Sequence, residues 1–288
     1  MPNHRAEGAA SILLGLGIAA NALLGPLVFG VIEIRESANM ENQLLGGELT
    51  SLLLAAPLAV VAGILWWRRS AVAPLLAMGP AGFGLYTYVQ FVLVPDYSRY
   101  PGNNERYFPL YLALVGLSWV LLWRSWRQLS ARRIEVPGRG LAIATGAVIV
   151  AVNVAFAMAW CASIAAELRG PLTADYIEHP TAFWLIRLMD LGFVIPIGLF
   201  TGSRLLRSSG GAAATAFGFV GVQLLLACAV AGMAIRMSIR GDPGVTLLLL
   251  TVSSAAALTF VVLFALLLRS AIRVRWVVPH ANAVARAA

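Results

Sequence analysis

The chain has 288 residues, of which 60% are hydrophobic and only 12% charged, and its mean hydropathy is +0.82. An ordinary soluble domain carries about 25% charged and 45–50% apolar residues. This composition excludes a water-soluble globule, and the apolar content together with only two cysteines excludes a disordered chain or a disulfide scaffold. We therefore expect an all-α, polytopic integral membrane protein.

The formal net charge is +8, and all 21 basic residues are arginine. Without lysine the chain has no Walker-A lysine, no Schiff-base lysine and no lysine general base. Heavy use of Arg, Ala, Leu, Val and Gly is typical of a G+C-rich bacterial genome, so we expect a bacterial protein.

Transmembrane segments follow from length and polarity, because a bilayer core about 30 Å thick requires about 20 apolar residues in a helix. Eight segments qualify, which predicts eight transmembrane helices in a single membrane domain. Glu33 and Glu36 stand where a signal-peptide cleavage site would need small residues, so we interpret the first segment as a retained span. In chain order the segments are about 11–34, 50–67, 73–95, 107–123, 141–166, 182–203, 213–235 and 245–268.

The orientation follows from the arginines of the connecting segments, since short cytoplasmic loops are enriched in Lys and Arg. With the N-terminus inside, the inner side has 14 Arg and two acids and the outer side has 7 Arg and 11 acids. The inner charged residues are Arg5, Glu7, Arg68, Arg69, Arg124, Arg127, Arg132, Arg133, Glu135, Arg139, Arg204, Arg207, Arg269, Arg273, Arg275 and Arg286. We predict a plasma (cell) membrane protein with both termini cytoplasmic. Its expected partners are the lipid bilayer and the anionic headgroups of the inner face, and we expect no nucleic-acid partner.

A shift of 139 residues aligns segment 57–82 with 196–221 and gives eight identities in 26 positions, Pro57 with Pro196 and Gly63 with Gly202 among them. Such a match suggests two parallel four-helix repeats, an N-terminal half (1–139) and a C-terminal half (140–288). The alternative is that apolar helices containing Gly and Pro resemble one another by chance.

Arg187 and Asp190 form the strongest candidate site. They are three residues apart on one helical face, and Asp190 lies below the outer interface. Ionisable groups at such depth are rare and often mark a ligand site or a pathway. A structural ion pair between helices is the alternative. As the rim of a ligand-binding pocket around this pair we predict Glu33, Glu48, Tyr86, Gln90 and Asp96.

Several chemistries have no motif in the chain. All three histidines (His4, His179 and His280) lie outside the spans, and neither HExxH nor GxSxG occurs. We therefore expect no metal and no cofactor, and we interpret Cys161 and Cys228 as small packing residues rather than a redox pair.

The leading hypothesis is a multi-pass membrane protein that binds or moves a small polar or lipid-like ligand through an outward-facing pocket at Arg187 and Asp190. An outward-facing membrane enzyme that acts on a lipid-linked substrate through outer-loop carboxylates is the first alternative. The second is an accessory or structural subunit, with a membrane protein partner and no ligand. Whether the protein is an enzyme stays open on the sequence.

Overall fold

The computed structural model describes the chain except for residues 1–3, 133, 135–137, 208–210 and 274–288, and it describes only the backbone of residues 174 and 175. The protein is 84% helical, with no strand in the described part, which confirms the all-α prediction. The elements are α1 (His4–Ala22), η1 (Leu23–Leu27), α2 (Ala38–Thr50), η2 (Ser51–Ala55), α3 (Ala56–Trp67), α4 (Ala73–Leu93), η3 (Asn104–Tyr107), α5 (Phe108–Ala131), α6 (Arg139–Arg169), α7 (Ala174–Glu178), α8 (Pro180–Met189), η4 (Asp190–Val194), α9 (Ile195–Leu206), α10 (Ala212–Ile239) and α11 (Leu247–Arg273).

Seven helical segments in the described part are long and apolar enough to cross a membrane, as expected for a membrane-embedded protein. They are His4–Leu27, Ala38–Trp67, Asn104–Ala131, Arg139–Arg169, Pro180–Leu206, Ala212–Ile239 and Leu247–Ile272. Helix α4, which corresponds to the third of the eight predicted segments, is not among these seven. It is 21 residues long and lacks charged residues, but its glycines, two prolines, two tyrosines and a glutamine lower its hydropathy below that of the seven. Every residue from 73 to 84 is nevertheless buried.

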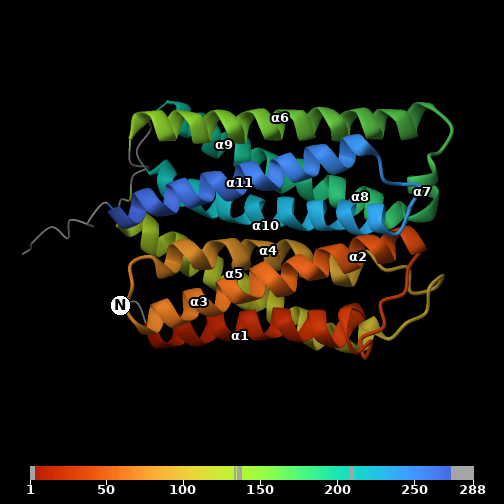
Figure 1. The fold of residues 1–288 in the computed structure, drawn as a ribbon, viewed down its shortest axis with the longest axis horizontal. Helices are drawn as coiled ribbons and strands as arrows, with labels where there is room; N and C mark the ends of the chain where they lie inside the picture. The colour runs from red at the N-terminus through yellow and green to blue at the C-terminus, as the bar shows by residue number, and fades with distance from the viewer. Residues whose placement is uncertain (1–3, 133, 135–137, 208–210, 274–288) are drawn as a thin grey trace, which may run out of the picture.

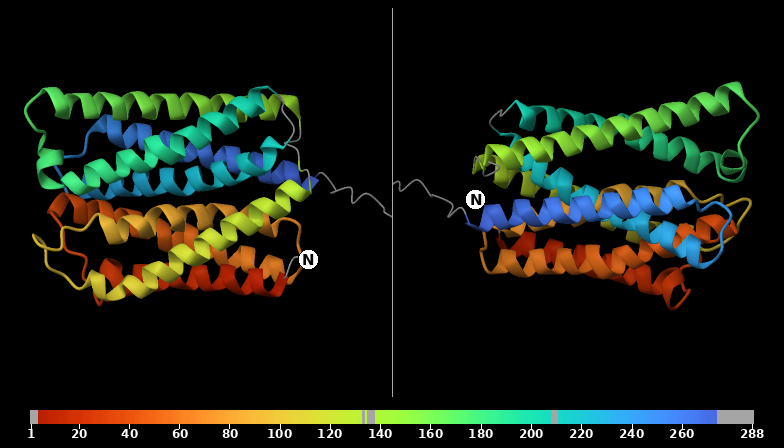
Figure 2. Two further views of the ribbon diagram at one scale, coloured as in Figure 1. Left: turned by 180° about the vertical axis from the view of Figure 1, so that it is seen from behind. Right: turned by 45° about the horizontal axis from the view of Figure 1, so that its top comes forward.

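The helices run side by side along the long axis, with residues 4–131 forming one side of the bundle and residues 139–273 the other (Figures 1 and 2). Within the first side α1 packs on α3 and α4 packs on α5, and within the second α6 packs on α9 and α10 packs on α11. Helix α10 joins the two sides, because it also packs against α2 and α4.

Glycines bring the backbones of these helices close together. A Cβ atom added to Gly46 would lie 2.5 Å from the carbonyl oxygen of Gly232, and one added to Gly79 would lie 3.0 Å from that of Gly221. Small residues permit such approaches in a membrane, where lipid offers no hydrophobic drive for helix association. The α2–α10 and α4–α10 contacts therefore depend on residues without side chains.

The second span is longer than its hydropathy predicts. It begins at residue 38 rather than near residue 50, because Ser37 caps the helix by accepting a hydrogen bond from the Met40 N–H. Its first turns are polar, so a hydropathy criterion misses them. Glu48, expected at a helix boundary, consequently lies well inside the span.

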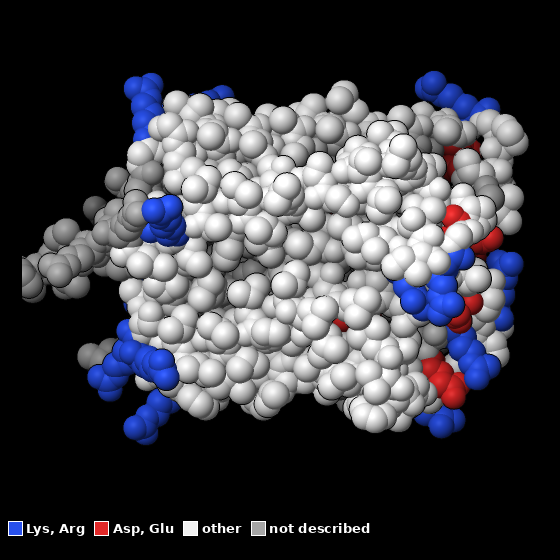
Figure 3. Space-filling view, viewed as in Figure 1, with Lys and Arg blue, Asp and Glu red and all other residues white. Residues whose placement is uncertain are grey.

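Charged side chains gather at the two ends of the bundle, and the lateral surface between them is almost free of charge in the view of Figure 3. The end that contains the start of α1 and the end of α3 displays only arginines in this view, whereas the opposite end displays both signs. Of the charged residues assigned to the inner side, four lie outside the described residues: Arg133, Glu135, Arg275 and Arg286.

Candidate functional site

Asp190 accepts hydrogen bonds from two neutral donors on different helices. The Tyr86 hydroxyl of α4 lies 2.9 Å from Oδ1, and the Trp160 indole Nε1 of α6 lies 2.8 Å from Oδ2. Gln90, one turn further along α4, interacts with the same Tyr86 hydroxyl. The structure thus brings three predicted residues, Tyr86, Gln90 and Asp190, into one group between α4, α6 and η4.

Arg187 is 7% exposed and lies one turn before Asp190. Its Nε donates to Ser163 Oγ over 2.8 Å, and its Nη1 donates to the Phe183 carbonyl oxygen over 3.0 Å. The guanidinium carbon lies 3.2 Å from the ring centroid of Phe183 and 4.7 Å from that of Trp160. Trp160 therefore connects the two candidate residues, since it faces the arginine with its ring and donates its N–H to the aspartate.

Glu48 forms a second buried group on the other side of α4. Its carboxylate accepts a 3.1 Å hydrogen bond from Asn21 Nδ2 of α1, and its side chain is almost completely enclosed. The Asn21 Oδ1 and the Tyr88 hydroxyl are buried without a hydrogen-bond partner among the described residues. Glu48 is therefore separate from Asp190, and the predicted pocket residues do not form a single group.

The helix that carries each carboxylate widens beside it. In η4 the Ile195 N–H donates to the Asp190 carbonyl oxygen, five residues back, and in η2 the Ala56 N–H donates to the Ser51 carbonyl oxygen in the same way. A proline follows each π-helical turn, Pro196 in one case and Pro57 in the other. Because proline cannot donate a backbone hydrogen bond and crowds the preceding turn, it favours such a local widening.

Glu33 and Asp96 lie at the end of the bundle where the η1–α2 and α4–α5 connections meet. Glu33 pairs with Arg35 over 3.0 Å, and both side chains are exposed. Asp96 accepts hydrogen bonds from Ser98 and from the Arg99 N–H, and these hold its pKa below the usual range. Both carboxylates stabilise loop structure and lie outside the two buried groups.

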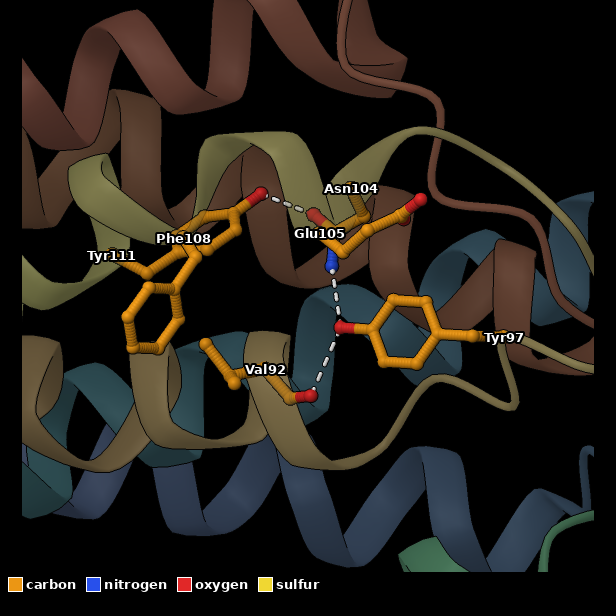
Figure 4. Close-up of a pocket in the computed structure, with 6 residues that line it drawn as sticks. All are labelled: Val92, Tyr97, Asn104, Glu105, Phe108 and Tyr111. Carbon is orange, nitrogen blue, oxygen red and sulfur yellow. Dashed lines mark hydrogen bonds between the residues drawn. The ribbon is translucent and has the colours of Figure 1, made fainter.

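The cavity drawn in Figure 4 has a volume of about 370 Å³ and lies between the end of α4 and the start of α5. The Tyr97 hydroxyl donates to the Val92 carbonyl oxygen over 2.9 Å, and the Tyr111 hydroxyl donates to Asn104 Oδ1. None of the seven predicted site residues lines it. Its lining residues are Val92, Tyr97, Asn104, Glu105, Phe108 and Tyr111.

Trp160 and Ser163 were not among the predicted site residues, although both contact the predicted pair. Both lie on one face of α6, three residues apart. A tryptophan six residues inside the predicted end of an apolar span, rather than at the interface where aromatic residues gather, is the sequence signal for it. The described residues contain no group of three or more His, Cys, Asp or Glu side chains placed to hold a metal ion.

Comparison with known proteins gives no relative. No family model, no curated protein and no solved structure matches the chain.

Proposed function

We propose that this is a bacterial cell-membrane protein that binds or moves a small polar or lipid-like ligand bearing an acidic group, with Arg187 as the anion contact and Asp190 as the proton-carrying group. The observation that carries the proposal is the position of Asp190, about 15 Å along its span, where neutral donors from two other helices hold it. A charged group at such depth is costly, and function is a common reason to keep it.

The neutral character of the two donors supports a protonation role. Tyr86 and Trp160 donate hydrogen bonds to the carboxylate, and neither donor carries a charge. Arg187 instead directs its Nε to Ser163 and its Nη1 to a backbone carbonyl. A ligand carboxylate or phosphate that exchanged with these neutral partners would gain a charge-assisted hydrogen bond.

We further propose eight spans with α4 as the third, arranged as two parallel four-helix repeats. Helices α3 and α9 begin at 56 and 195, α4 and α10 begin at 73 and 212, and the π-helical turns begin at 51 and 190, all 139 residues apart. The first and second spans of each half also approach through glycines, Gly8 with Gly63 and Gly146 with Gly202. With this shift Glu48 corresponds to Arg187 and Asp190 corresponds to Ser51, so the two buried carboxylates lie about one helical turn apart on corresponding spans.

The orientation is part of the proposal. The end of the bundle that contains the start of α1 would face the cytoplasm, and the end with the Glu33 and Asp96 loops would face outward. In this orientation a ligand would reach Asp190 from the outer side along α4, past Gln90 and Tyr86.

Thermal unfolding of the purified chain in lipid nanodiscs tests the proposal. We expect one class among small carboxylates, amino acids, phosphates and lipids to raise the melting temperature of the wild type, but not of Asp190→Asn or Arg187→Ala. A ligand at 100 times its Kd stabilises a protein by about 2.7 kcal/mol, which is readily measured. Glu41→Gln, on an exposed face of α2, is the matched control and should respond like the wild type. An equal shift in Asp190→Asn, or no shift with any ligand class, would contradict the proposal.

A further inference from the structure

Three chemically complementary side chains meet at the outer end of the bundle, apart from both buried carboxylate groups. Glu36 and Ser37 immediately precede α2, and His179 immediately precedes α8. The His179 Nε2 lies 2.6 Å from Ser37 Oγ, and its Nδ1 lies 3.3 Å from Glu36 Oε2. The histidine and glutamate side chains are 5% and 2% exposed, so the imidazole is held between a hydroxyl and a carboxylate with little access to water.

The charge of Glu36 determines which groups of this cluster donate hydrogen bonds and which accept them. Burial raises the pKa of Glu36 to about 6, so its carboxylate is ionised at neutral pH and can only accept hydrogen bonds. Its Oε1 accepts the Asp96 N–H over 3.3 Å, whereas its Oε2 lies 3.3 Å from His179 Nδ1 and accepts no hydrogen bond from the described residues. A proton on Nδ1 would lie next to this negative charge, which favours the Nδ1–H form of a neutral His179 and leaves the Nε2 lone pair to accept the Ser37 hydroxyl proton.

Two other charged residues, Glu178 and Arg99, lie near this group. Glu178 Oε2 lies 3.9 Å from Nε2, beyond hydrogen-bonding distance, and its side chain is 47% exposed. Arg99 donates to the Glu178 carbonyl oxygen, over 3.4 Å. Ser37 Oγ also accepts the Met40 N–H, over 3.4 Å, which leaves its own proton available to the imidazole.

Backbone N–H groups next to Ser37 are placed to stabilise a negative charge. Ser37 is the N-cap of α2, so the N–H groups of Ala38 and Asn39 belong to the first turn, where no intrahelical acceptor exists. The helix N-terminus adds a partial positive potential at the same place. An oxyanion formed on a carbonyl attacked by Ser37 would be stabilised by these N–H groups.

We propose that Ser37, His179 and Glu36 form a hydrolytic site for carboxylic esters presented at the outer bilayer surface. Ser37 Oγ bonds to the acyl carbon while its proton passes to His179 Nε2, and the ester C–O bond breaks as the alcohol leaves with that proton. Water then attacks the acyl-serine, gives one proton to Nε2 and releases the carboxylic acid, and Ser37 regains its proton. Ser37 and His179 are the catalytic residues, and Glu36 is a positioning residue.

The location indicates an ester with an apolar acyl chain. Ser37 directly precedes the membrane-crossing segment Ala38–Trp67, which places it at the bilayer boundary. The connection that leads to it carries three exposed apolar side chains, Val28, Phe29 and Val31, at 60%, 65% and 48% exposure.

A fluorophosphonate probe, which reacts with activated serine hydroxyls, tests the proposal on the full chain in nanodiscs. We expect one label per chain, located on Ser37 by peptide mass spectrometry, and hydrolysis of 4-nitrophenyl octanoate. Labelling should fall at least 100-fold in Ser37→Ala and in His179→Gln. Ser37→Asn retains an N-cap oxygen and should also remain unlabelled, which separates loss of the nucleophile from loss of the helix cap.

Ser98→Ala is the matched control, because Ser98 is an exposed serine in a nearby loop whose hydroxyl hydrogen-bonds the Asp96 carboxylate rather than a histidine. It should be labelled like the wild type. Glu36→Gln should lower the labelling rate and move the midpoint of its pH profile to lower pH, because the charge that favours a protonated imidazole is gone. A purely structural role would change the yield of folded protein and leave that midpoint in place.

Absence of label from folded wild-type protein would overturn the proposal, as would label on any serine other than Ser37. A negative result in the ligand-binding test at Asp190 would not affect the proposal for Ser37, since the two sites share no residue.

Discussion

The two sides of the bundle enclose their carboxylates differently. Glu48 is 1% exposed. Of the 18 most apolar consecutive residues in its span, 44% are buried inside the protein, and the share in the preceding span is 39%. Asp190 is only partly buried. In its own span and in the preceding one, the buried share of the 18 most apolar consecutive residues is 22% in each case. The difference indicates that Glu48 belongs to a closed core, whereas Asp190 lies in a part of the bundle that other helices cover less completely.

Packing explains the difference. On the first side α1 contacts α3 and α5, and α2 contacts α10, so Glu48 has helices around it. On the second side α6 makes its main contact with α9 and leaves much of its surface to the lipid. The two π-helical turns therefore lie beside carboxylates in different surroundings. Variants at Glu48 and at Asp190 can test this contrast.

The largest expected effect comes from the contact that joins the two sides. A leucine at Gly46 would collide with the backbone of Gly232 and Met233, so Gly46→Leu should destabilise the protein by about 3 kcal/mol or more. Gly116→Leu on α5 is the control, because an added Cβ there meets no atom within 4 Å. Size-exclusion profiles and unfolding in mixed micelles measure the difference. Equal stability of the two variants would mean that α2 and α10 do not pack as described.

Removal of each carboxylate gives the next largest effect and separates the two environments. Glu48→Ala leaves the buried Asn21 amide without its acceptor and creates a cavity, so we expect a loss of about 3 kcal/mol of unfolding free energy. Asp190→Ala leaves Tyr86 and Trp160 without an acceptor at a more open place, and we expect about 1 kcal/mol. Denaturant titration in mixed micelles compares them. A larger loss for Asp190→Ala would reverse the contrast between the two sides.

A smaller, pH-dependent effect is expected where the α10–α11 connection meets α2. Burial alone would raise the pKa of Asp242, but hydrogen bonds from the Gly244 N–H, Asn39 and Asn42 outweigh it and hold the pKa below its ordinary value of 3.8. The folded protein therefore binds this proton less readily than the unfolded chain, so the carboxylate stabilises the fold above pH 3.8, and this stability is lost as the pH falls below that value. Solvent screening limits the effect to about 0.5 kcal/mol.

Melting curves between pH 6 and pH 3 measure this contribution. The acid-induced fall in melting temperature should be slightly smaller in Asp242→Asn than in the wild type. A steeper fall in the variant would show that Asp242 does not link the two sides through its charge.

Much of the candidate site was accessible from the sequence, because Asp190, Arg187 and Glu48 are ionisable residues in or beside apolar segments. The single predicted pocket was not reproduced by the geometry. Glu48 is enclosed separately with Asn21, and Glu33 and Asp96 lie in surface loops with local partners. Two buried asparagines, Asn21 and Asn153, differ in what they bond. Asn21 reaches Glu48 on another helix, whereas Asn153 donates to the Ile149 carbonyl of its own helix.

The sequence by itself determined the helical fold class, the approximate positions of the membrane-crossing segments and the presence of ionisable groups among them. It could do so because a bilayer acts on each segment separately, through local hydropathy and charge. Only the tertiary structure decided which side chains meet. Tyr86 is 104 residues from Asp190, and Ser37 is 142 residues from His179. Such contacts depend on how closely whole helices pack, which is set by many small van der Waals contacts between distant segments. A local pattern of residues does not encode that fit.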